Sequence, residues 1–222
     1  KTCSSKVSWE PLFITTICPG CGGLLSGEHD SIVLQCRNCE SFWQEHNNKF
    51  IPLEWKVVAS DDPHGHSLPF WQVTASIKGS DLKSFGDYLR FTNQPLVALP
   101  KYDKIPLVFW IPAFKINPKA FLQIASQLTV AQARIPQGET RRVANGYPVT
   151  LDQQEALQAI KSVLANTIVN KENRFPLLPE LRLGKSHCQL TYLPFVAQSH
   201  DMVQEHTYAT VQTAALRYGR SL

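Results

Sequence analysis

Two Cys-x-x-Cys pairs constrain this chain more than any other feature of its sequence. The pairs are Cys18/Cys21 and Cys36/Cys39, and 14 residues separate them. Four thiolates at this spacing can surround one metal ion tetrahedrally, and zinc is the usual ion in such a site. Because four sulfurs leave no open position for a substrate, the ion would stabilise structure and would not activate water. We therefore expect one structural zinc ion.

The residues around the cysteines predict a compact unit of turns and strands. Gly22 and Gly23 follow the first pair and allow the positive φ that such a turn needs. Residues 31–35 predict a strand that leads to the second pair. In their spacing and their Cys-Pro-Gly-Cys-Gly turn, residues 14–45 resemble the zinc-ribbon modules of many transcription, translation and multisubunit enzyme proteins. The second turn departs from that pattern, because Glu40 stands where glycine is usual.

Other uses of these cysteines remain open from the sequence. Two disulfides, a redox-active dithiol or a rubredoxin-like iron site need the same residue type. The short connection between the pairs favours the compact zinc form. Cys3 and Cys188 lie outside the two pairs and far apart in the chain. We interpret both as free thiols, which predicts a reducing compartment and a cytoplasmic protein.

Length and composition predict two domains without a membrane span. The 222 residues can hold a zinc ribbon at 1–50 and an α+β domain at 51–222. A hydrophobic content of 43% and a charged content of 18% are typical of a soluble globular protein. The most apolar stretch, 105–114, contains two prolines and is too short to cross a bilayer. Peripheral contact with a membrane surface stays open.

Hydrophobic periodicity in residues 51–222 predicts a mixed, mainly antiparallel sheet with two or three helices. Residues 51–59 and 68–78 alternate like strands and predict a β-hairpin with its tip at 61–66. Helices are expected after the capping residues Asp81, Asn117 and Thr150. Further strands are expected at 105–114, 188–197 and 202–212.

A basic segment offers a candidate surface for an acidic partner. Residues 1–50 hold four bases and five acids, whereas residues 101–148 hold seven bases and two acids. If these bases share one face, they create a positive field, and an aromatic residue among them could anchor a contact. A solvated face around an aromatic core strand fits the same pattern. The candidate partner-binding residues are Lys101, Lys104, Trp110, Lys115, Arg141 and Arg142.

Two weaker constellations could carry chemistry, and we expect neither to do so. His64 and His66 have the residue type of a second metal site, but no complete ligand set accompanies them. Cys188 could be a nucleophile if a histidine met it in space, yet it stands in an apolar strand pattern. Glycine-rich nucleotide-binding motifs are absent from the sequence.

These patterns favour a non-catalytic subunit or adaptor that binds protein partners within a larger assembly. The closed metal site, the lack of a catalytic motif and the paired aromatic residues support this prediction. One alternative is a nucleic-acid-binding protein that uses the basic surface of 101–148. A second alternative is an enzyme with an unfamiliar site in 51–222.

Overall fold

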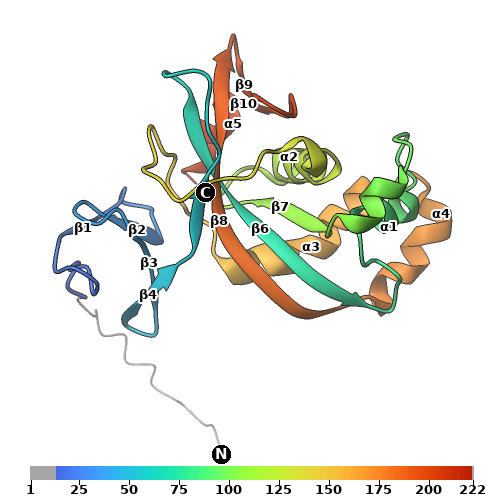
Figure 1. Cartoon of the computed structure of the whole chain (residues 1–222), viewed down its shortest axis with the longest axis horizontal. Coiled ribbons are helices and arrows are strands. Elements are labelled where there is room, and N and C mark those ends of the chain that lie inside the picture. The colour runs from blue at the N-terminus through green and yellow to red at the C-terminus, as the bar shows by residue number, and fades with distance from the viewer. Residues whose placement is uncertain (1–13, 222) are drawn as a thin grey trace, which may run out of the picture.

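The computed structural model describes residues 14–221, and they form an α+β fold with two sheets (Figure 1). Cys3 lies outside the described residues. The N-terminal sheet has the antiparallel order β1-β2-β3-β4. Its strands are β1 (Leu25–Ser26), β2 (Val33–Cys36), β3 (Phe42–His46) and β4 (Lys49–Leu53). The expected strand at 31–35 is therefore confirmed as β2, two residues further on.

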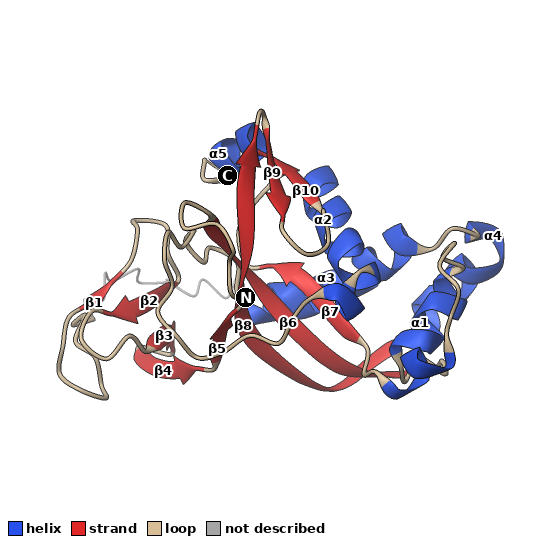
Figure 2. Cartoon of the chain, turned by 45° about the horizontal axis from the view of Figure 1, so that its top comes forward, coloured by secondary structure: helices blue, strands red, loops and turns tan. Residues whose placement is uncertain are grey.

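The main sheet has six strands in the order β10-β9-β8-β6-β7, and β5 pairs with β8 in parallel. All its other pairs are antiparallel, as predicted. Figure 2 shows its two longest strands, β6 and β8, twisting side by side next to the small N-terminal sheet. The bounds are β5 (Trp55–Val57), β6 (His66–Lys78), β7 (Val108–Pro112), β8 (Arg182–Gln198), β9 (Asp201–Gln204) and β10 (Thr210–Gln212).

The predicted hairpin between 51–59 and 68–78 is wrong. The first segment splits, so that β4 pairs with β3 and β5 pairs with β8. Strand β6 pairs with β7 on one edge and with β8 on the other. The 17-residue β8 forms a far longer ladder with β6 than the three-residue β5 could. The tripeptide Leu-Pro-Phe occurs at 68–70 and again at 193–195, and the two copies meet in this ladder, where Leu68 lies opposite Leu193.

Alternation along β6 sends its side chains into two cores. Trp71, Val73 and Ile77 are buried in the larger core, whereas Leu68 and Phe70 are buried in the smaller one. Helices α1 and α3 supply residues to the larger core, and α5 supplies them to the smaller one. Helix α2 lies along β7 and contributes Ala125 to the first core and Ile124 to the second.

Five α-helices are present in the described residues, whereas the sequence predicted two or three. The two helices that were not predicted, α4 and α5, are short. Their bounds are α1 (Phe85–Thr92), α2 (Pro118–Val130), α3 (Gln153–Thr167), α4 (Lys171–Arg174) and α5 (Thr213–Gly219). Asn117 caps α2 as predicted, and its side chain accepts a hydrogen bond from the N–H of Ala120 at 2.9 Å.

Two predicted helix starts are displaced, because a better cap lies further along the chain. Helix α1 is capped by Ser84 and not by Asp81, since Ser84 and Asp87 form a complete capping box. Helix α3 is capped by Asp152, which forms the same arrangement with Glu155, so Thr150 lies outside the helix.

The expected strand at 202–212 is interrupted by a turn. The side-chain oxygen of Gln204 accepts hydrogen bonds from the N–H groups of His206 and Thr207 at 3.0 and 2.7 Å. This contact closes the turn between β9 and β10, and α5 follows directly.

The N-terminal sheet packs against the main sheet. Val33, Phe42 and Leu53 belong to the larger core. The Phe42 ring lies 5.4 Å from that of Trp55 and 5.7 Å from that of Tyr192, between centroids. These contacts place one face of the N-terminal sheet on the larger core, whereas Cys18 and Cys36 pack in a separate small cluster with Leu25 and Trp43. Within residues 14–221, no helix is long and apolar enough to cross a membrane.

Candidate metal centre

Two tight turns carry the four cysteines. In the first, the N–H of Gly22 donates to the carbonyl of Cys18 at 2.9 Å, and Gly22 has a φ of 72°. In the second, the N–H of Glu40 donates to the carbonyl of Cys36 at 3.1 Å, and Glu40 has a φ of 59°. Glu40 therefore adopts the left-handed conformation that glycine adopts more readily, at a cost of roughly 1 kcal/mol. The departure from the usual glycine leaves the turn geometry intact.

The four sulfur atoms converge on one point. One ligand atom from each of Cys18, Cys21, Cys36 and Cys39 lies within 4.8 Å of the others. The sulfurs of Cys18 and Cys39 are 3.7 Å apart, and those of Cys21 and Cys36 are 3.5 Å apart. Four sulfurs at about 2.3 Å from a tetrahedral zinc ion would be separated by about 3.8 Å. The cluster could therefore hold a metal ion, and its size fits zinc.

The same distances show that the four cysteines do not form two disulfides. A disulfide joins its sulfurs at about 2.05 Å, well below the spacing found here. Cys18, Cys21, Cys36, Cys39 and Cys188 are all free thiols in the described part of the chain.

Neighbouring groups shift the thiol pKa values in opposite directions. The Asn38 side chain and the backbone N–H of Gly23 lower the pKa of Cys21 to about 6. The backbone N–H of Cys39 lowers the pKa of Cys36, but burial and the adjacent thiols outweigh it and raise that pKa to about 11. Four thiols this close resist ionising together unless a cation balances their charge.

Two residues beside the cluster were not identified as site residues in the sequence. The Trp43 indole N–H donates to the Ser41 hydroxyl at 2.7 Å, and that hydroxyl lies 3.0 Å from the Cys39 sulfur. Trp43 also packs with the buried Cys18 and Cys36. Both residues belong to the Ser-Phe-Trp sequence that follows the second cysteine pair. Only the hairpin of β2 and β3 shows that Ser41 and Trp43, and not Phe42, face the sulfurs.

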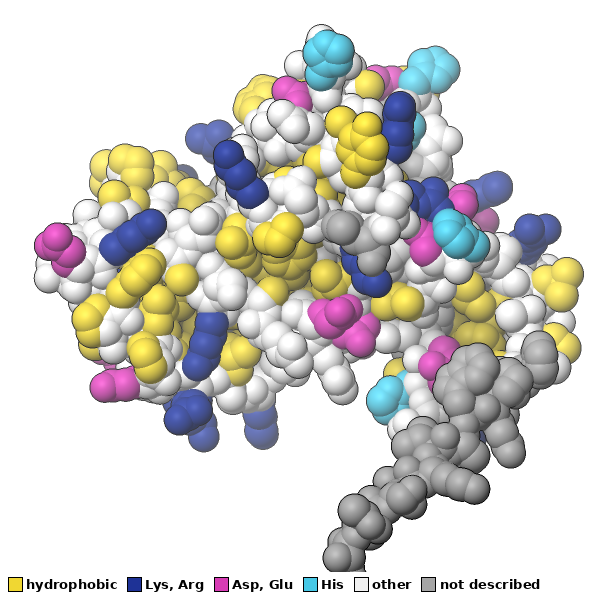
Figure 3. Space-filling view, turned by 180° about the vertical axis from the view of Figure 1, so that it is seen from behind, with side chains coloured by type: hydrophobic (Ala, Val, Ile, Leu, Met, Phe, Trp, Pro, Cys, Tyr) yellow, Lys and Arg dark blue, Asp and Glu magenta, His cyan; other side chains and the backbone are white. Residues whose placement is uncertain are grey.

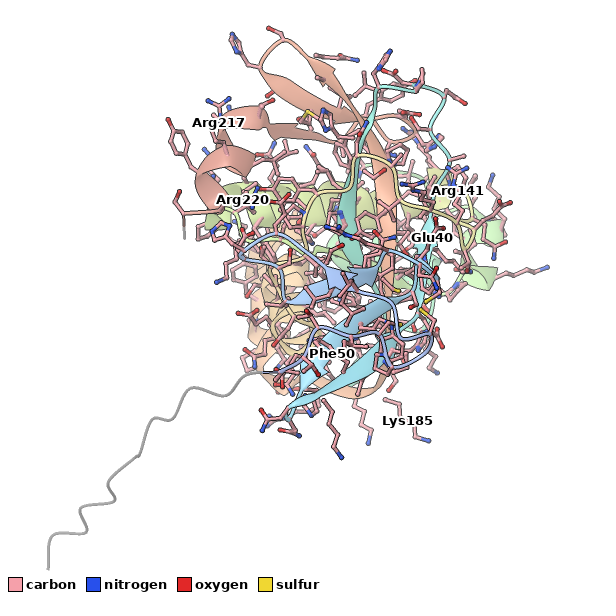
Figure 4. All side chains as sticks on the ribbon, turned by 90° about the vertical axis from the view of Figure 1, so that its left-hand side faces the viewer. Glu40, Phe50, Arg141, Lys185, Arg217 and Arg220 are labelled. Atoms are coloured by element: carbon pink, nitrogen blue, oxygen red, sulfur yellow. The ribbon has the colours of Figure 1, made fainter. Side chains whose placement is uncertain are left out.

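The six candidate partner-binding residues do not share one face. Lys101 and Lys104 lie on the η1 turn (Pro100–Lys104) beside α1, at one end of the molecule. Arg142 lies at the opposite end, with its Nε 3.9 Å from the Glu40 carboxylate, and Figure 4 shows Arg141 close to Glu40. Figure 3 shows lysines and arginines spread widely over the face of the molecule that it draws. The segment 101–148 separates its charges because it crosses the molecule through β7 and α2.

Trp110 is a core residue, which corrects its prediction as a partner-binding residue. Its side chain is only 4% exposed and packs in the smaller core. Lys115 is exposed and follows β7, where its carbonyl approaches Gly219 of α5.

The weaker constellations do not assemble. Within residues 14–221 the four cysteines are the only group of at least three ligands that could hold a metal ion, so His64 and His66 lack the further ligand. Cys188 lies on β8 ten residues before Gln198, about 33 Å along an extended strand, so His200 in the next turn cannot reach it. The Nε2 atom of its neighbour His187 lies 3.5 Å from the Glu54 carboxylate. Burial raises the pKa of the Cys188 thiol. This thiol has the features of a structural cysteine.

Comparison with known proteins identifies no match for this chain. No protein-family model matches the chain, and no curated protein and no solved structure matches it. The four-cysteine cluster is therefore the feature from which a function can be argued.

Proposed function

We propose that the protein is a non-catalytic adaptor in which a zinc ribbon at 14–45 is stabilised by one zinc ion. Cys18, Cys21, Cys36 and Cys39 are the four ligands, and the closed sulfur set gives the ion a structural role. The free thiol of Cys188 supports a reducing compartment, the cytoplasm. The adaptor binds a protein partner within a larger assembly.

One observation carries the partner-binding part of this proposal: large apolar side chains are exposed together at the end of the molecule that is distant from the cysteines. Of eleven exposed large hydrophobic side chains in residues 14–221, six lie at this end. Figure 3 shows hydrophobic areas on its left side, the side that lies at the right of Figure 1 where α1 and α4 are labelled. Exposed apolar groups that cluster in this way typically mark contact surfaces. We call this set the distal surface: Leu96, Val97, Leu99, Val169, Phe175 and Leu177.

Hydrogen bonds join the two segments of the distal surface. The Gln94 side chain donates to the carbonyl of Thr167 at 2.6 Å, and the N–H of Val169 donates to the carbonyl of Thr92 at 3.0 Å. The 94–99 loop and the 167–177 segment are therefore held side by side at the end of α1. Val97 and Val169 are 74% and 60% exposed, and they are the most accessible of the six side chains.

The charges around the distal surface favour an acidic partner. The basic residues here include Lys101, Lys104, Lys171 and Arg174, whereas the acidic residues include Glu172 of α4 and Asp103, which is paired with Arg90 at 2.6 Å. The Lys171 ammonium lies 5.7 Å from the centre of the Phe175 ring, so it borders the apolar side chains directly. Apolar anchors edged by positive charge fit a protein surface that combines hydrophobic and acidic residues.

The nucleic-acid and enzyme alternatives have less support. A polyanion would favour one continuous basic face, but Lys101 and Arg142 lie at opposite ends of the molecule. An enzyme needs a nucleophile or base in an assembled site, but His200, beyond the end of β8, lies too far from Cys188 to serve as its base, and His187 lies next to Glu54.

A double variant of the distal surface tests the adaptor proposal. Val97→Asp with Val169→Asp should lower the amount of stoichiometric partner that co-purifies from the native source by at least about tenfold, because two exposed apolar side chains that the partner would cover become charged. The melting temperature should stay within about 2 °C, since both positions are exposed. Quantitative mass spectrometry after mild cross-linking measures the partner.

Two matched variants complete this experiment. Tyr218→Asp changes another exposed apolar residue, on α5, and should leave the partner bound. Arg141→Glu with Arg142→Glu tests the basic loop next to the N-terminal sheet. Retention of the partner by the distal variant would exclude the distal surface. Salt-sensitive binding of a mixed-sequence oligonucleotide that the arginine variant abolishes would favour the nucleic-acid alternative.

A further inference from the structure

A cavity of about 470 Å³ lies between α2, the end of α3 and the turn that joins β9 to β10. Strand β10 and α2 lie side by side above this cavity (Figure 2). The volume falls within the range that is typical of ligand pockets. Among the described residues that line the cavity there is no lysine, arginine, histidine, aspartate or glutamate. The lining consists mainly of amide, hydroxyl and aliphatic side chains, so it offers a charged ligand no counter-ion.

Three amide side chains of the lining are each held at one end by the main chain. The Gln94 amide nitrogen donates to the carbonyl of Thr167 at 2.6 Å. The Asn166 amide nitrogen donates to the carbonyl of Leu122 at 3.3 Å, and the Gln127 side-chain oxygen accepts from the first N–H of β10 at 3.3 Å. These main-chain partners fix the orientation of each amide. The side-chain oxygens of Gln94 and Asn166 and the amide nitrogen of Gln127, which form no hydrogen bond within residues 14–221, remain for a ligand.

Tyr208 lines the same cavity and has a strained backbone. Its φ is 60°, in the left-handed region that glycine adopts more readily. The turn holds it there, because the N–H of Tyr208 donates to the carbonyl of Gln204 at 2.9 Å and the N–H of Gln204 donates to the carbonyl of Ala209 at 2.8 Å. The Tyr208 side chain is 73% exposed, so packing within the chain does not compensate the strain. A strained residue without a packing role points to a role in binding.

We propose that this cavity binds a neutral sugar ring. Each sugar hydroxyl both donates and accepts, so hydroxyls on adjacent carbons can pair with the oxygens of Gln94 and Asn166 and with the nitrogen of Gln127. A carboxylate only accepts and would leave both oxygens unpaired, whereas an ammonium only donates and would leave the nitrogen unpaired. The N–H and C=O of a peptide group point in opposite directions, which suits three amide ends around one cavity less well. The exposed Tyr208 ring offers a flat apolar surface to the C–H face of the sugar.

Proton NMR titration of the metal-loaded full chain measures sugar binding without a protein partner, although Val169 lines the cavity and also belongs to the distal surface. The probes are the methyl glycosides of glucose, galactose, mannose and N-acetylglucosamine. At least one of them should bind saturably with a Kd of about 10 mM or tighter. The carboxylate and ammonium derivatives of that sugar should each bind at least about tenfold more weakly, because the cavity offers neither charge a partner.

Tyr208→Gly separates binding from stability. It should weaken glycoside binding at least about tenfold, yet the melting temperature should stay the same or rise, because glycine adopts this φ without strain. Tyr208→Phe keeps the ring and should keep the affinity. Gln127→Glu keeps the oxygen that accepts from β10 but replaces the amide nitrogen, so it should weaken binding about tenfold. Tyr218→Ala is the control, because it removes an exposed ring on α5, outside the cavity.

Absence of saturable binding by all of these glycosides would overturn the sugar site. Equal binding of the charged derivatives, or unchanged affinity in Tyr208→Gly, would overturn it as well. N-acetylglycine N-methylamide presents uncharged peptide groups and serves as the competing probe. Tighter binding of this amide than of any glycoside would assign the cavity to a peptide and not to a sugar.

Discussion

Removal of the metal, by a chelator or by Cys36→Ser, is expected to unfold residues 14–45 and to lower the stability of the main sheet. The binding free energy of a structural zinc site is about 10–16 kcal/mol in isolated peptides, and it is largely the folding free energy of the module. The main sheet loses contacts as well, because Val33 and Phe42 of the N-terminal sheet belong to the larger core. We expect the main sheet to stay folded with a melting temperature at least about 10 °C lower.

Hydrogen exchange followed by mass spectrometry separates these effects by segment. Amides of 14–45 should lose protection after chelation, and those of β6 and β8 should keep most of theirs. Cys188→Ser is the matched control, because this thiol lies outside the cluster. Unchanged protection of 14–45 in the metal-free protein would contradict a structural metal. Loss of all cooperative unfolding would show instead that the two predicted domains fold as one unit.

Phe42→Ala is expected to lower the free energy of unfolding by roughly 3–5 kcal/mol, as truncation of a fully packed aromatic residue usually does. The Phe42 ring joins the two sheets, because its neighbours are the rings of Trp55 and Tyr192. Phe42 and Trp43 are adjacent on β3 and pack in different clusters, the former in the larger core and the latter with the cysteines. The substitution should therefore weaken the contact between the sheets and leave the metal in place.

Denaturant unfolding together with metal analysis measures both consequences. Trp43→Ala is the matched comparison and should instead lower metal affinity, because the Trp43 indole positions Ser41 beside the sulfur of Cys39. A cost below about 1 kcal/mol for Phe42→Ala would mean that the contact between the sheets contributes little to stability.

Features that depend on nearby residues were predictable from the sequence. The cysteine spacing located the cluster, because both turns are local and lie within 22 residues. Asn117 followed by Pro118 located the start of α2, since cap and first turn are adjacent. The alternation in 68–78 gave one buried face of β6 correctly, with Trp71 and Val73 fully buried, but it did not show that Leu68 and Phe70 on the other face are buried as well.

Features that depend on long-range pairing were not predictable. The partner of β6 is β8, more than 100 residues away, and this pairing replaced the expected hairpin. This pairing also brings Thr191 to Gln72, whose side-chain oxygen accepts from the Thr191 hydroxyl at 3.2 Å, although the sequence gives no sign that they meet. The distal surface likewise combines two segments that are distant in the sequence and are joined by hydrogen bonds at the end of α1.

The central claim, a structural zinc ion held by four cysteines, is tested most directly by the metal content of the purified protein. Elemental analysis combined with native mass spectrometry should find one zinc ion per chain after metal-replete purification, and Cys36→Ser should lose it. Less than about half an equivalent of zinc, or iron in its place, would contradict the assignment of Cys18, Cys21, Cys36 and Cys39 as a structural zinc site.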